Sequence, residues 1–274
     1  MKRRSVKRKK KRTSLKIAII LLMFLVSGVS AYIFFSFPDI AALKKHNPRK
    51  TSFMEYREAE WKKQGKKYAI QQRWVSLSQI SPYLIKAVLI AEDDKFWSHE
   101  GFDYEAIQKA IEKDIKAKKF KLGGSTISQQ LAKNMYLSPS KNPVRKIKEA
   151  IITWRMEKVL SKKRILELYL NVAEWGDKGI FGIEAASGHY YGKPASGITP
   201  EEAARLASVL PTPRKYNPLG DSKYVLNRSN LIYSIMVRRG IVVPEYEEVV
   251  EEDKKESNQS EIKGPQETTI PSAQ

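Results

Sequence analysis

The 274-residue sequence contains no cysteine and only three histidines. Without cysteine, the chain has no disulfide bond, no thiolate metal site and no cysteine nucleophile. The histidines, His46, His99 and His189, are scattered and do not form a zinc-binding motif. Convincing strand patterns and internal repeats are also missing, whereas helical periodicity recurs along the chain. We therefore expect a mainly α fold with one compact domain over residues 68–240.

Acidic side chains are absent from residues 1–16, which hold ten lysines and arginines. They gather instead in residues 245–274, where nine acids accompany three bases. This tail is also poor in aromatic residues, so we expect it to be disordered. Because the net charge of the whole chain is +20, the part between these ends favours an anionic partner. Charge alone leaves open nucleic acid, an anionic membrane surface or a phosphorylated substrate.

Residues 17–37, IAIILLMFLVSGVSAYIFFSF, form a long run without any charge. About 20 helical residues cross a bilayer core roughly 30 Å thick, whereas the apolar part of a signal peptide is shorter and ends in small residues. The run ends in bulky residues, so it predicts an uncleaved transmembrane helix. The basic residues 1–16 would hold the N-terminus in the cytoplasm. Residues 38–67, predicted as a stalk, and the following domain would then lie outside, away from nucleic acid.

The stretch IAEDDKFWSHEGFD places Glu92 at the end of an apolar run, YLIKAVLIA. A carboxylate at such a buried edge is partly desolvated, which raises its pKa and makes it a competent general base near neutral pH. The nearby Phe96, Trp97 and His99 could enclose such a site. The alternatives are an exposed acid cluster at a helix end and a hydrogen-bonded structural histidine.

The stretch GGSTISQQLAKNMY contains a capping-box pattern, because Thr126 is followed three residues later by Gln129. A helix is therefore expected to start near Ile127. A capped helix N-terminus attracts phosphate, and Gln130 and Lys133, three residues apart, would point the same way. The spacing excludes a Walker phosphate loop. A plain joint between a loop and a helix is the alternative reading.

The stretch NPVRKIKEAIITWRMEKVL predicts a long helix whose buried stripe consists of Val144, Ile147, Ile151 and Trp154. Its charged residues are Arg145, Lys146, Lys148 and Arg155, with Glu149 among them. A solvated face of salt bridges is the alternative. Taken together, two carboxylates, a phosphate-prone helix start and a cation-rich helix on an outward-facing domain suit a reaction on a sugar with a lipid-linked phosphate leaving group.

These stretches resemble the motifs of the peptidoglycan glycosyltransferases, the family of the glycosyltransferase domain of bifunctional penicillin-binding proteins. The five matching segments, in order, are EDDKFWSHEG, GGSTISQQLAKN, RKIKEA, RILELYLN and GIEAASGHYYGK. The segment NVAEWGDKGIFG is more similar to the monofunctional members. The resemblance implies a lysozyme-like helical fold with a large lobe and a smaller membrane-proximal lobe, at the inner (plasma) membrane of a bacterium.

The resemblance also implies an activity and its residues. Lipid II would be polymerised into β-1,4 glycan chains with release of undecaprenyl diphosphate, Glu92 being the general base and Glu149 the second essential acid. The residues implied to bind substrate are Lys133, Lys146, Gln130, Ser125, Thr126, Arg145 and Lys141, the last standing where many relatives carry arginine. A divalent cation, Mg²⁺ or Mn²⁺, is left open as a cofactor. The implied partners are lipid II, the growing glycan strand, membrane lipid and other cell-wall synthesis or division proteins.

Two other functions remain as alternatives. A lysozyme-like lytic enzyme would cleave finished glycan with one carboxylate, but it would not need the cations between Lys133 and Arg155. A non-catalytic membrane scaffold would use the basic surface alone, and its Glu92 and Glu149 would be replaceable.

Overall fold

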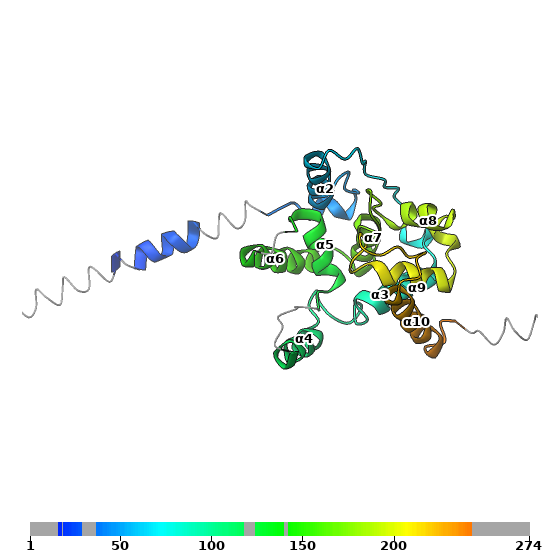
Figure 1. Cartoon of the computed structure of the whole chain (residues 1–274). Coiled ribbons are helices and arrows are strands. Elements are labelled where there is room, and N and C mark those ends of the chain that lie inside the picture. The colour runs from blue at the N-terminus through cyan, green and yellow to red at the C-terminus, as the bar shows by residue number, and fades with distance from the viewer. Residues whose placement is uncertain (1–15, 18, 29–36, 118–123, 140–141, 243–274) are drawn as a thin grey trace, which may run out of the picture.

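The computed structural model describes residues 16–17, 19–28, 37–117, 124–139 and 142–242, and these form a helical protein (Figure 1). Its helices are α2 (Ser52–Lys63), α3 (Pro82–Glu92), α4 (Tyr104–Ala117), α5 (Ile127–Tyr136), α6 (Pro143–Val159), α7 (Lys162–Val172), α8 (Ile183–Tyr191), α9 (Pro200–Val209) and α10 (Lys223–Arg238), with short 3₁₀ helices η1 (Ala41–Lys44), η2 (Leu77–Gln79) and η3 (Ala195–Gly197). Within the described residues, β structure is limited to two isolated bridges, Gln71 with Ile180 and Glu174 with Phe181. The expected mainly α class is confirmed.

Local capping chemistry fixes where two of these helices begin. Thr126 accepts a hydrogen bond from the backbone N–H of Gln129 at 3.2 Å, and the Gln129 side chain accepts one from the Thr126 N–H at 3.0 Å. Thr199 and Glu202 make the same reciprocal pair at the start of α9, where Pro200 occupies the first helical position. Each pair satisfies two backbone donors that a helix start leaves free. The helix start expected near Ile127 is confirmed.

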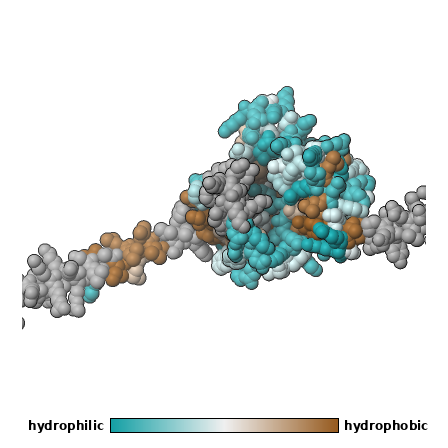
Figure 2. Space-filling view, turned by 60° about the horizontal axis from the view of Figure 1, so that its bottom comes forward, coloured by the Kyte–Doolittle hydropathy of each residue, from teal (hydrophilic) through white to brown (hydrophobic). Residues whose placement is uncertain are grey.

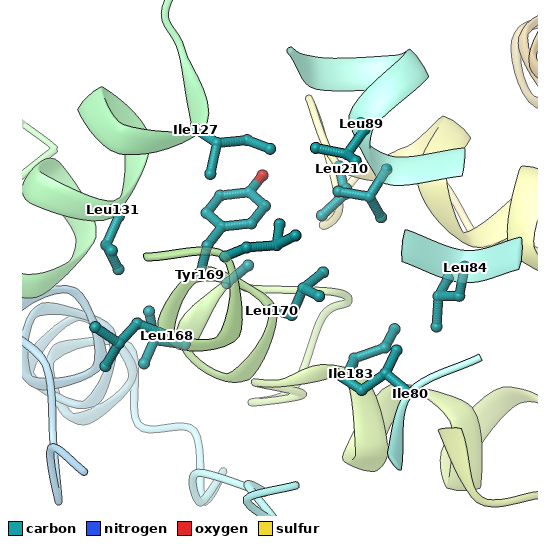
Figure 3. Close-up of a cluster of buried hydrophobic side chains, with 14 of the residues drawn as sticks. Ile80, Leu84, Leu89, Ile127, Leu131, Leu168, Tyr169, Leu170, Ile183 and Leu210 are labelled. Atoms are coloured by element: carbon teal, nitrogen blue, oxygen red, sulfur yellow. The ribbon is translucent and has the colours of Figure 1, made fainter. Parts of the chain in front are cut away.

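Helix α7 forms the centre of the core. Leu168, Tyr169 and Leu170 are buried, and Figure 3 shows them between Leu131 of α5 at the left and Leu84 of α3 at the right. Helix α3 packs against α9 and α10, and α5 packs against α6 and α7. The end of α3 and the start of α5 are thus held by the same core.

Residues 38–67, expected as a stalk, contribute buried side chains. Ile40 and Leu43 belong to the main core, and Trp61 packs in a second cluster with Phe181. The guanidinium of Arg57 donates two hydrogen bonds, at 2.9 and 2.8 Å, to the carboxylate of the buried Glu174. The segment around α2 is therefore packed against the rest of the structure.

The predicted buried stripe of α6 is wrong. Val144, Ile147 and Trp154 are more than half exposed, at 57%, 62% and 55%, and the fourth member, Ile151, is only partly buried. The buried residues of α6 are instead Glu149, Ile152, Thr153 and Met156. Their spacing of i, i+3, i+4 and i+7 is as regular as that of the predicted stripe. An apolar pattern could not reveal this face, because two of its four members are polar.

The N-terminal described residues form a helical stretch over residues 16–28, apart from residue 18, with exposed apolar side chains. Figure 2 shows this stretch as a brown run between grey atoms, outside the largely hydrophilic surface of the domain. In the described part of the chain, no helix has both the length and the apolar character needed to cross a membrane. Residues 29–36 of the predicted span, residues 1–15, Lys141 and the acidic tail lie outside the described residues.

Candidate active site

Glu92 is the last residue of α3, and its side chain is only 8% exposed. The Gln130 side-chain amide donates a hydrogen bond to Glu92 Oε2 at 2.8 Å, whereas the buried Oε1 has no hydrogen-bond partner among the described residues. Burial raises the pKa of Glu92, because it disfavours the charged form, while Gln130 and the cations Arg228 and Lys133 act in the opposite direction. Gln130 thus holds one carboxylate oxygen, whereas the other receives no hydrogen bond and keeps its capacity to accept a proton.

Tyr169 fixes the amide that holds Glu92. Its hydroxyl donates to Gln130 Oε1 at 3.2 Å, so the Gln130 amide nitrogen faces the carboxylate. Burial raises the pKa of Tyr169 well above its usual value, which keeps the hydroxyl protonated as a donor. Tyr169 lies in the segment RILELYLN, but the sequence pattern alone did not reveal this role.

The charges of both candidate acids, Glu92 and Glu149, act on Lys133. It follows Gln130 by three residues on α5, and it is mostly buried. Burial lowers the pKa of Lys133; the charges of Glu149 and Glu92 raise it, and those of Arg145 and Lys146 lower it. Glu92 and the charged residues of α6 therefore both act electrostatically on Lys133.

Glu149 is a buried anchor for the cations of α6. Its residue is 2% exposed, and its carboxylate accepts from Arg145 Nη1 at 2.6 Å and from Lys146 Nζ. Lys146 Nζ also lies 3.5 Å from Ser125 Oγ, in the loop before α5. Arg145 and Lys146 thus pair with one buried carboxylate, whose charge also acts on Lys133 of the adjacent α5. We call Lys133, Arg145 and Lys146 the cationic cluster.

Thr126 is placed differently from the other predicted substrate-binding residues. Its hydroxyl donates to the Gly101 carbonyl at 2.7 Å and accepts the capping bond from Gln129, and the residue is 2% exposed. Both bonds are structural. Ser125 and Gln130 are partly exposed beside the carboxylates, and Lys141 lies outside the described residues.

Asp93 and His99 tie the end of α3 to the start of α5. His99 Nδ1 accepts from the Gly101 N–H at 3.1 Å, so its Nε2 carries the proton and donates to Asp93 at 2.9 Å. Asp93 Oδ2 accepts from the Ile127 N–H at 2.9 Å. His99 thus has the structural role that the sequence left open. Of the two aromatic residues expected to enclose the site, Phe96 is fully buried and Trp97 is half exposed.

A pocket of about 220 Å³ opens beside Glu92. It is lined by Ile90, Ala91, Glu92, Asp93, Asp94, Asp103, Ala106, Gly124, Ser125 and Thr126. Carboxylates and hydroxyls on this wall can bond sugar hydroxyls, whereas the cationic cluster suits phosphate. The residues that the structure describes include no group of three or more acids and histidines arranged to hold a metal ion. A role for Mg²⁺ or Mn²⁺ stays a prediction.

A desolvated carboxylate with one unpaired oxygen, next to a cationic cluster on a helical scaffold, suits an enzyme that activates a hydroxyl beside an anionic leaving group. Residues 59–237 match the transglycosylase family. The chain is 45% identical over 221 residues to the biosynthetic peptidoglycan transglycosylase of Nitrosospira multiformis, an alignment covering 81% of this chain and 96% of that protein. It is 53% identical over 180 residues to the protein of the same description from Azoarcus sp., covering 66% and 78%. The chain therefore belongs to the transglycosylase family.

Proposed function

We propose that this protein is a peptidoglycan glycosyltransferase that polymerises lipid II into β-1,4 glycan strands in cell wall synthesis. Membership of the transglycosylase family and the description shared by its relatives support this activity. One structural observation carries the proposal. The buried carboxylate of Glu92 has one oxygen that accepts a hydrogen bond and one that does not, and Glu149 pairs with the nearby cations Arg145 and Lys146.

In the proposed reaction, Glu92 acts as general base. Its unpaired Oε1 takes the proton of the lipid II sugar 4-hydroxyl. At the same time, the hydroxyl oxygen attacks C1 of the growing strand's reducing-end sugar. A new C1–O bond forms while the bond from C1 to the diphosphate oxygen breaks, and the proton stays on Glu92. Because the α linkage of the donor becomes β in the product, the displacement inverts C1 in one step.

Negative charge develops on the departing undecaprenyl diphosphate. We assign its stabilisation to Lys133, Lys146 and Arg145, because cations fixed in advance where charge develops lower the barrier most. Glu149 would hold two of these cations in position rather than transfer a proton itself. Burial lowers the pKa of Lys133, although the charges of Glu149 and Glu92 act in the opposite direction.

The test of the activity compares two substrates. Purified full-length protein is incubated with labelled lipid II or with finished glycan, and the products are separated on a gel. We expect a ladder of longer products from lipid II and unchanged finished glycan. Shortened glycan would support a lytic enzyme instead, and no change with either substrate would support a scaffold.

We infer that the protein is anchored in the plasma membrane by residues 17–37, with the catalytic domain outside. The exposed apolar stretch at residues 16–28 supports this location. The exposed Val144, Ile147 and Trp154 on α6 support it as well, because the Arg155 guanidinium of the same helix lies 5.7 Å from the ring of Phe37, where the predicted span ends. The lysozyme-like two-lobed arrangement and contacts with other cell-wall synthesis proteins belong to the same proposal.

The absence of cysteine makes this topology directly testable. Single variants Ser5→Cys and Asn230→Cys would each carry the only thiol of the chain, and Asn230 is exposed on α10. In intact cells, a membrane-impermeant maleimide is expected to label Asn230→Cys and to label Ser5→Cys only after lysis. Labelling of both variants before lysis, or of Ser5→Cys alone, would contradict the proposed orientation.

A further inference from the structure

Arg228 of α10 contacts Glu92 through the carboxylate oxygen that Gln130 leaves open. Its Nη2 lies 3.6 Å from Glu92 Oε1, and its Nε is buried without a hydrogen-bond partner among the described residues. At 3.6 Å the two groups form an ion pair but not a hydrogen bond. Oε1 therefore keeps its capacity to accept a proton while a positive charge stands next to it. No sequence motif indicated a role for this arginine.

The same guanidinium fixes the backbone that carries Glu92. Arg228 Nη2 donates to the Ala91 carbonyl at 3.0 Å. Ala91 lies in the last turn of α3, where carbonyls have no partner within the helix. Since α10 packs against α3, the arginine reaches this turn from a neighbouring helix of the core. One side chain thus contacts both the helix end and the carboxylate.

A buried general base needs a lasting counter-charge. Burial favours the neutral form of Glu92, and a protonated carboxyl cannot accept the substrate proton. The titratable groups that act on Glu92 are Asp93 beside it, Lys133 from α5, neutral Tyr169 from α7 and Arg228 from α10. Asp93 opposes ionisation, and Lys133 is assigned to the diphosphate. Arg228 is the cation in this set that the proposed mechanism leaves to Glu92 throughout.

We propose that Arg228 is a positioning residue of the active site, which keeps Glu92 ionised and holds it at the end of α3 until the acceptor hydroxyl binds. It acts through Glu92 and does not touch the reacting atoms. The proposal rests on the assignment of Glu92 as general base.

The test is the pH dependence of lipid II polymerisation by the full-length protein. Arg228→Gln keeps a hydrogen-bond donor but removes the charge, and Arg228→Lys keeps the charge. An adjacent cation typically lowers the pKa of a carboxyl by about one to three units. Without that cation, the acid limb of the pH–rate profile of the Gln variant is expected to lie about one pH unit or more higher than that of wild type. Its rate would then fall roughly tenfold on the acid side and recover to within about threefold of wild type at high pH. The acid limb of the Lys variant should stay near that of wild type.

Arg238→Gln is the matched control, because it removes the same charge from an exposed position on the same helix. Its profile should equal that of wild type. A Gln variant with an unchanged acid limb, or with the same loss at every pH, would overturn the proposal. So would a Lys variant that behaves like the Gln variant. A Gln variant that unfolds at the assay temperature, beside a folded Lys variant of normal profile, would make Arg228 a scaffold residue only.

These outcomes are separate from those that test the base itself. If Glu92→Gln polymerises lipid II normally, the assignment of the base fails and the Arg228 proposal fails with it. If Glu92→Gln is inactive while the profile of Arg228→Gln matches that of wild type, only the role of Arg228 is refuted.

Discussion

Replacing Glu92 by glutamine is expected to abolish glycan polymerisation while lipid II still binds. General-base catalysis typically contributes about 10²- to 10⁴-fold to a rate, and the amide of glutamine cannot accept the proton. The replacement has the same shape and can still accept the hydrogen bond from Gln130. The measurement is the initial rate with labelled lipid II, together with a binding isotherm.

The matched control is Glu100→Gln, which removes an acid eight residues away whose side chain is 81% exposed and pairs with Lys158 at the surface. Its rate should stay within about twofold of wild type, as expected for a surface pair of small energetic worth. Normal synthesis by Glu92→Gln would remove the base from the mechanism. Lost binding in that variant would instead make Glu92 a substrate ligand.

The same carboxylate sets a pH dependence in the wild-type enzyme. Because burial raises the pKa of Glu92, its base form is lost at a higher pH than that of a free glutamate as the solution is acidified. The sign is therefore a loss of activity with falling pH, beginning above the ordinary glutamate range.

Replacing Glu149 by glutamine or alanine is expected to give the second large loss, about 10²-fold or more, as is typical when a preorganised charge arrangement is disturbed. Arg145 and Lys146 would lose their shared carboxylate, and their charges would repel that of Lys133. Folding stability should also fall by about 2 kcal/mol, less than for a fully buried pair because Lys146 is nearly half exposed.

Two measurements separate these effects, namely the rate under saturating lipid II and the thermal unfolding midpoint. Glu58→Gln is the control, because it breaks an ion pair with Lys50 in which both side chains are about 40% exposed. It should change neither quantity. Near-normal turnover by either Glu149 variant would reduce this residue to a structural role.

The features that sequence could predict depend on neighbouring residues. Thr126 with Gln129 and Thr199 with Pro200 act within one helical turn, so the starts of α5 and α9 followed from local chemistry. The partly buried position of Glu92 followed from the apolar run before it. The class of helical fold and the family motifs were visible for the same reason.

Features that depend on distant contacts could not be predicted. The face that α6 buries is decided by its packing on α5 and by the charges gathered around Glu149, not by its own apolar pattern. Arg228 lies 136 positions after Glu92 in the numbering, and only the packing of α10 on α3 brings the two together. The ring of Tyr169 is buried in the core (Figure 3), and the hydroxyl at its end donates to Gln130 in the site.

The docking of α2 has a consequence for how the enzyme would meet its lipid substrates. Arg57 clasps Glu174 with two hydrogen bonds, and Trp61 is buried beside Phe181, so the chain leading from residue 37 is locked onto the catalytic body. If residues 17–37 lie in the bilayer, the catalytic domain would not be joined to the membrane by a flexible linker over the segment that follows. The fold would then fix the distance between Glu92 and the lipid headgroups, near which a polyprenyl-linked sugar must present its hydroxyl.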